Sequence, residues 1–126
     1  KILQFWINFI NKKNYAGISY EVVADPTGNK INRLRIFVNS RKANFTIYSL
    51  AYNLEKNKPS IYVRDDLIFL DHFDLDTCNL KINQEKIVMR EIDKVINNLI
   101  NKKIKNNITL SEYQKLSKSQ WLKWLD

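Results

Sequence analysis

The sequence predicts an α+β fold, a two-layer sandwich in which a small antiparallel sheet carries helices on one face. Helical spacing of apolar residues recurs in three separate segments. Strand-like segments lie between them in pairs: the first pair shows two-residue alternation, and the second pair consists of short apolar runs. Strands joined by a short turn pair antiparallel. The expected order is therefore α-β-β-α-β-β-α, followed by a helical C-terminal tail.

A helix and a β-hairpin are expected at the start of the chain. "KILQFWINFINKK" places its apolar side chains on one helical face. "ISYEVVA" then alternates as a half-buried strand does, and Pro26 and Gly28 supply a turn before "INRLRIFVN". We expect these two strands to form a hairpin.

The second helix is expected from about Thr46 to Lys56. "NKP" ends it, because the residue before a proline disfavours helical geometry. "SIYV" and "LIFL" are then predicted as a second hairpin, with "RDD" between them as a tight turn.

The last elements are a long helix and a helical tail. The longest helical stripe begins near Gln84. Thr109 and Glu112 then form a capping-box pattern, which predicts the start of a short helix. With 126 residues the chain can bury one core, so we expect an α+β domain over 1–105 and a helical tail over 106–126. The tail ends in apolar residues that need cover from this domain or from a partner: Trp121, Leu122, Trp124 and Leu125.

Composition narrows the function classes. No window reaches the roughly 20 apolar residues that a membrane-spanning helix needs. The single Cys78 cannot form an internal disulfide, which favours a cytoplasmic location. The formal charge of +8 suits contact with phosphates, although the lysines are interleaved with asparagine and isoleucine.

A search for catalytic groups finds no complete active site. There is no P-loop, no dinucleotide fingerprint and no nucleophile elbow. His72, Cys78 and the nearby carboxylates match no zinc or calcium spacing, so no metal ligand and no catalytic residue is assigned. The carboxylates after "LIFL" are interpreted as a solvated acidic rim.

Three arginines are the candidate binding residues. Arg64 lies at the end of a predicted strand, and we weigh anion binding there against a salt bridge to Asp65, Asp66 or another carboxylate. Arg33 and Arg35 are expected on an exposed sheet face that also carries Phe37, opposite Leu34, Ile36 and Val38.

The order of segments resembles a known domain. "GISYEVVADPTGNKINRLRIFVN", a helix, and "KPSIYVRDDLIFLDHFDLDTCNLKINQEKIVMREIDKVI" together resemble the C-terminal small domain of fold-type I pyridoxal-phosphate enzymes. The similar group contains bacterial selenocysteine synthase and D-glucosaminate-6-phosphate ammonia-lyase. Two features depart from the group: Phe73 stands where an arginine is frequent, and the tail after Asn101 matches nothing in it.

The resemblance implies a C-terminal substrate-capping domain of a pyridoxal-phosphate-dependent lyase or transferase. The Schiff-base lysine and most cofactor contacts would belong to a large domain of the parent chain, and we expect the parent enzyme to be a homo-oligomer. This piece would then neither bind pyridoxal phosphate nor catalyse alone, and Arg64 would contact an anionic substrate.

Two alternatives come from other classes. A small basic module could bind nucleic acid through the sheet face that carries Arg33, Arg35 and Phe37. A protein-interaction domain could dock through Trp121 and Trp124.

Overall fold

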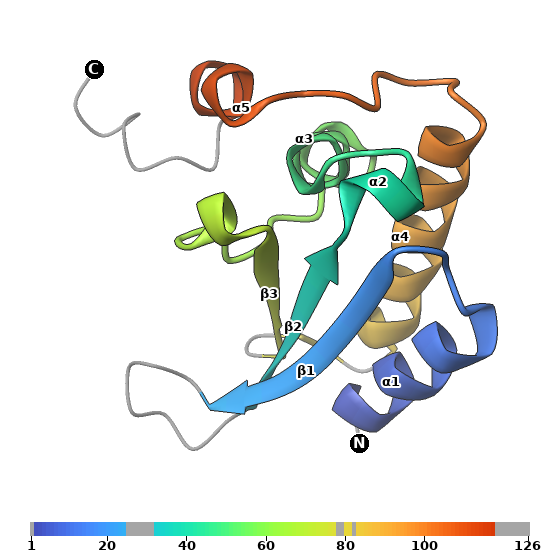
Figure 1. Ribbon diagram of the computed structural model, residues 1–126. Coiled ribbons are helices and arrows are strands. Elements are labelled where there is room, and N and C mark those ends of the chain that lie inside the picture. Colours follow the sequence, from blue (N-terminus) through green and yellow to red (C-terminus); the bar gives the residue numbers. More distant parts are fainter. Residues whose placement is uncertain (1, 25–31, 78–79, 82, 118–126) are drawn as a thin grey trace.

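The computed structural model describes residues 2–24, 32–77, 80–81 and 83–117, and it confirms the α+β class (Figure 1). Three strands form one antiparallel sheet in the order β1-β2-β3. The elements are α1 (Ile2–Lys13), β1 (Ile18–Ala24), β2 (Asn32–Val38), α2 (Ser40–Ala43), α3 (Ile47–Lys56), the 3-10 helix η1 (Ile68–Leu70), β3 (His72–Asp76), α4 (Gln84–Ile100) and α5 (Leu110–Leu116).

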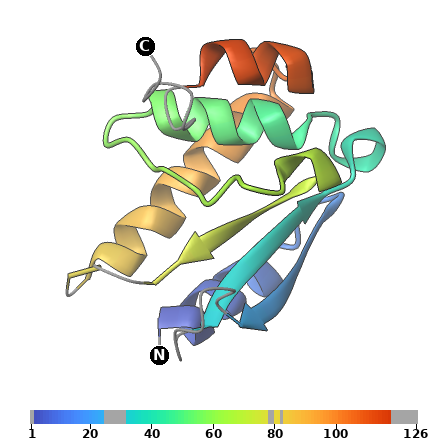
Figure 2. The ribbon, with the colours of Figure 1, turned by 90° about the vertical axis from the view of Figure 1, so that its left-hand side faces the viewer.

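Helices cover one face of the sheet. Figure 2 turns the other face toward the viewer, with α1 and α4 behind the strands and α3 and α5 stacked at one end. On the covered face, Ile36 and Phe73 meet Ile10 of α1 and Ile92 of α4 around an apolar cavity of about 20 Å³. Sheet and helices therefore share one apolar core.

The predicted first helix and first hairpin are confirmed. Trp6 of α1 is 1% exposed, and its indole N–H donates to the carbonyl of Glu85 at 3.1 Å. β1 and β2 pair antiparallel, with Glu21 opposite Arg35. The predicted turn at Pro26 and Gly28 lies outside the described residues.

A short helix that the sequence pattern does not predict, α2, connects β2 to α3. The side chain of Asn39 accepts the N–H of Lys42 at its start, and Asn44 ends it with φ 65°. Gly17, just before β1, has φ +77°, and a Cβ there would lie 2.5 Å from the backbone nitrogen of Ala43. Only glycine allows the chain to approach α2 this closely at this conformation.

The strands predicted for the second hairpin differ from those observed. "LIFL" forms η1 instead of a strand, and "SIYV" leads to a single bridge between Arg64 and Asp74. The strand is the next segment, "HFDLD", so the prediction that its carboxylates form a solvated acidic rim is wrong. This segment alternates apolar and polar residues, so Phe73 and Leu75 enter the core while the polar side chains point away from it. "LIFL" lacks that alternation and buries Ile68 alone.

The remaining predicted helices are confirmed. α3 begins at the cap residue Thr46, whose side chain accepts the N–H of Ser49. α4 begins at Gln84, and α5 begins with the expected capping box of Thr109 and Glu112. Within the described ranges, no helix is long and apolar enough to cross a membrane.

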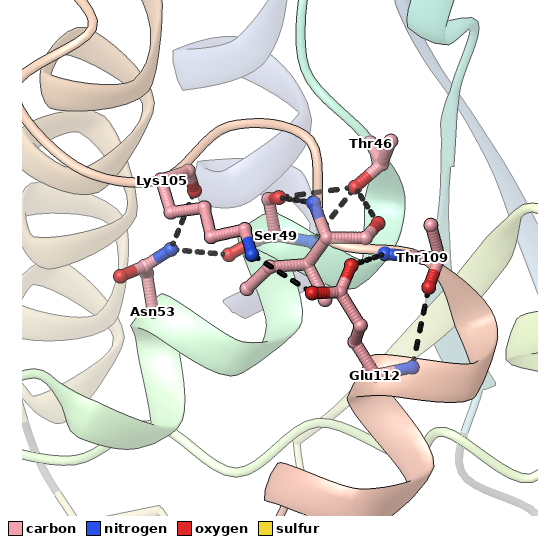
Figure 3. A network of polar contacts seen from close by, with 7 residues as sticks. Thr46, Ser49, Asn53, Lys105, Thr109 and Glu112 are labelled. Carbon is pink, nitrogen blue, oxygen red and sulfur yellow. Dashed lines mark hydrogen bonds and ion pairs between the residues drawn. The ribbon is translucent and has the colours of Figure 1, made fainter.

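The first part of the predicted tail packs against α3. Ser49 accepts the N–H of Ile108 at 2.8 Å, and Thr46 donates its hydroxyl to the carbonyl of the same residue at 2.7 Å (Figure 3). Ile108 and Tyr113 are each 1% exposed and belong to the common core. Trp121, Leu122, Trp124 and Leu125 lie outside the described residues.

Candidate functional site

Charged side chains of β2 and β3 gather on the sheet face opposite α1 and α4. Figure 2 shows this face of the ribbon toward the viewer. Alternation along β2 and β3 directs them there, and the strand register places Arg35 opposite Asp74 and Arg33 opposite Asp76. Arg64 precedes η1 and lies beside β3, because its backbone N–H and carbonyl pair with those of Asp74 at 2.9 and 3.0 Å. We call these five residues the arginine–aspartate cluster.

Arg35 and Asp74 form the tightest pair of the cluster. The Nε and Nη2 atoms of Arg35 donate to the two carboxylate oxygens of Asp74 at 2.8 and 3.2 Å. This two-bond geometry is the strongest that arginine makes with a carboxylate. The hydrogen bond to Asp74 raises the pKa of Arg35 above its ordinary value, so the guanidinium stays charged.

Arg33 is the buried arginine of the cluster. Only 5% of the residue is exposed, and its guanidinium lies 3.7 Å from carboxylate oxygens of both Asp74 and Asp76. These carboxylates balance the positive charge inside the fold, which a buried cation requires. The arrangement indicates a structural role for Arg33, and the expectation that Arg33 lies on an exposed sheet face is wrong, because this arginine is buried against the two carboxylates.

Arg64 is the exposed arginine of the cluster. Its side chain is 56% exposed, and its Nε and Nη2 atoms contact one oxygen of Asp76 at 3.3 and 3.2 Å. A guanidinium has five N–H donors, so the contacts with this one carboxylate oxygen do not use all the donors of Arg64. Arg64 can therefore contact an anion without entering the protein interior.

His72 lies beside the cluster and is 6% exposed. Its ring meets the ring of Phe37 in an edge-on contact, with centroids 5.1 Å apart. Within the described part of the chain, its buried Nδ1 atom has no hydrogen-bond partner. Burial, followed by the positive charge of Arg35, holds the pKa of His72 below its ordinary value, so the ring is neutral at neutral pH.

The structure brings the three predicted arginines together and adds residues that sequence reasoning missed. Arg64 bonds to Asp76, whereas Asp65, one of the partners considered from sequence, accepts the hydroxyl of Tyr113 at 2.6 Å. Asp74 and Asp76 were missed as partners because "HFDLD" was not recognised as a strand. Its two-residue alternation is the signal that would have placed them on the face of Arg33 and Arg35.

Two pockets among the described residues do not fit a pyridoxal-phosphate site. The pocket at the cluster has a volume of about 50 Å³, whereas ligand pockets usually measure about 300–1,000 Å³. A more open hollow of about 460 Å³ beside α2 is lined by Ser19, Phe37, Val38, Asn39, Ser40, Arg41 and Asp71. No lysine lines it, and a lysine is what forms the Schiff base with this cofactor.

Metal ligands do not gather in the part of the chain that the structure describes. No group of three or more His, Cys, Asp or Glu side chains there could hold a metal ion. His72 faces arginines, which disfavour a cation, and Cys78 lies outside the described residues.

Comparison with solved structures finds a similar fold in part of a larger enzyme. That enzyme is D-glucosaminate-6-phosphate ammonia-lyase, matched with a TM-score of 0.65 and 19% identity over 76% of this chain. The match covers 26% of the ammonia-lyase chain, so the present chain spans about a quarter of its length. No protein-family model matches the sequence, and no curated protein matches it either. At this identity the similarity establishes the fold alone.

Proposed function

We propose that this chain is the C-terminal substrate-capping domain of a pyridoxal-phosphate-dependent lyase or transferase, and that it does not catalyse alone. The observation that carries the proposal is the fold shared with about a quarter of D-glucosaminate-6-phosphate ammonia-lyase. The arginine–aspartate cluster supports it, because the exposed side chain of Arg64 is available to a second domain that packs on this side of the sheet.

The role proposed for this chain is to bind and orient the substrate. Arg64 contacts an anionic group of the substrate through the donors that Asp76 leaves available. The backbone pairing of Arg64 with Asp74 holds its Cα on the sheet, while the long side chain can still adjust. Arg35 and Asp74 form the rigid base of the site.

The parent enzyme supplies the remaining parts. Pyridoxal phosphate, when bound by the parent, supplies the electron sink for the reaction. The Schiff-base lysine belongs to a large domain of the parent chain, which we propose to be a cytoplasmic homo-oligomer. No step of the cofactor chemistry is assigned to residues of this chain.

Chemical labelling of the parent protein tests this function. Borohydride reduction of the purified parent should attach the cofactor covalently to one lysine, and peptide mapping should find that lysine before Lys1 of this sequence. A native reading frame that begins near Lys1, or a labelled lysine within residues 1–126, would overturn the proposal.

Kinetics of variants tests the role of Arg64. Arg64→Ala in the parent should raise KM for an anionic substrate about tenfold or more, because a charge-assisted contact is lost. Arg41→Ala removes an exposed arginine of α2 and should leave KM unchanged. Equal KM values in the two variants would remove Arg64 from the binding site.

Nucleic-acid binding is the second candidate function. The charge of +8 favours it, and Arg35 and Phe37 share the sheet face opposite the helices. Arg33 on the same face is 5% exposed and pairs with Asp74 and Asp76, so Arg35 would make the phosphate contacts. Binding to single- or double-stranded oligonucleotides should then weaken steeply with salt, because displaced counterions contribute to it. No mobility shift at low salt would remove this candidate.

A further inference from the structure

A cluster of exposed apolar side chains surrounds η1. Leu67, Phe69 and Leu70 are 41%, 56% and 55% exposed, whereas Ile68 between them is 4% exposed and anchors the turn. We call Leu67, Phe69 and Leu70 the η1 patch. Three large apolar side chains exposed within four residues form the kind of surface at which proteins bind another segment or partner.

The last described residues of the chain lie close to this patch. Tyr113 of α5 donates its hydroxyl to Asp65, two residues before the patch, at 2.6 Å. Ser117 lies one turn further along, with its N–H bonded to the carbonyl of Tyr113 at 2.9 Å and its hydroxyl bonded to Glu55 at 2.8 Å. These contacts bring the chain to the same side of the molecule as the patch.

The sequence beyond Ser117 complements the patch. Residues 118–126, "KSQWLKWLD", lie outside the described residues, and four of the nine are large and apolar. Lys118 and Lys123 outnumber the one acidic side chain of this segment, Asp126, whereas the exposed Asp66 and Asp71 flank the η1 patch. Nine residues can reach about 30 Å when extended, which is enough to span a neighbouring turn.

We propose that residues 118–126 cover the η1 patch through Trp121 and Trp124. The contacts of Tyr113 and Ser117 favour a segment of the same chain over a separate partner, because a tethered segment has a high effective concentration at a nearby surface. This inference does not depend on the proposed enzymatic function.

Indole signals in NMR spectra of the full chain test the proposal. Trp6 is the internal reference, since its indole is buried in the core and bonded to Glu85. In the wild type, a soluble paramagnetic agent should broaden the indole signals of Trp121 and Trp124 little. In Leu67→Ser/Phe69→Ser, broadening of at least one of the two should increase severalfold, while Trp6 stays unchanged.

The matched control is Val22→Ser on β1, at the opposite edge of the sheet from β3. Val22 is 44% exposed, close to the 41% of Leu67, so the substitution removes a similar apolar surface. It should leave all the indole signals as they are in the wild type. Two results would overturn the proposal: strong broadening of both tail indoles in the wild type, or protection that depends on protein concentration and so indicates a second copy.

Discussion

Two arginines of the arginine–aspartate cluster differ in their exposure to solvent. Arg33 is buried between two carboxylates, whereas the side chain of Arg64 is more than half exposed and contacts one carboxylate oxygen. A buried charge without a partner of opposite charge destabilises the fold, whereas an exposed ion pair contributes little to stability. The same residue type is therefore structural at one position and available for binding at the other.

Alanine substitutions should separate these two roles. Arg33→Ala should lower the free energy of unfolding by about 3 kcal/mol, because it breaks a buried network of charges. Arg64→Ala should change it by less than about 0.5 kcal/mol. Urea denaturation at neutral pH measures both values. Equal effects of the two variants would show that exposure does not distinguish them.

Glu91 of α4 should contribute stability that depends on pH. Its carboxylate accepts hydrogen bonds from Lys94 at 2.7 Å and from Asn57 at 2.8 Å. The hydrogen bond from Lys94, and after it that from Asn57, lowers the pKa of Glu91 to about 2. Because the folded pKa lies below the ordinary value of 4.5, this stability is complete above about pH 4.5 and is lost as the pH falls toward 2.

Glu91→Gln tests this pH dependence. At pH 7 the substitution should lower the free energy of unfolding by about 1–2 kcal/mol, since charge-assisted hydrogen bonds become neutral. The difference from the wild type should shrink as the pH falls from about 4.5 toward 2, where the wild-type carboxylate is itself protonated. Denaturation curves across this range measure it, and a constant difference would contradict the assignment.

Helices and strands differ in how well the sequence predicted them. α1, α3 and α4 have long apolar stripes, so their spacing alone located them. β3 was missed because its outward positions hold His72, Asp74 and Asp76, which resemble a polar loop. α2 is a single turn fixed by Asn39 and by the close approach of Gly17, and no periodicity can develop over four residues. The arginines of the site were predicted, but their partners required the register of β3.

α5 should depend strongly on its first turn. It has seven residues, too few to be stable without caps and tertiary contacts. Thr109→Ala removes the hydroxyl that accepts the N–H of Glu112 at 3.2 Å, and should cost about 1 kcal/mol. Thr109→Ser keeps the acceptor and should restore most of the loss. Thermal denaturation of both variants measures the effect, and identical melting temperatures for alanine and serine would refute the capping role.

Truncations from the C-terminal side should show which residues the folded domain requires. A chain that ends at residue 105 lacks Ile108 and Tyr113, two core side chains that are each 1% exposed. It should lose about 4 kcal/mol or more, which approaches the total stability of many domains. A chain that ends at residue 117 keeps both side chains and should remain folded. Circular dichroism during urea titration compares the two, and equal stability would mean that 106–117 is dispensable.

The one-sided covering of the sheet has an electrostatic consequence. In the isolated chain, water and dissolved ions reach Arg64 and screen its charge, so attraction for an anion should weaken quickly as ionic strength rises. A body that closes over this face would expel that water and lower the local dielectric constant, which strengthens the same attraction. Sensitivity to ionic strength would therefore report how completely the face is closed.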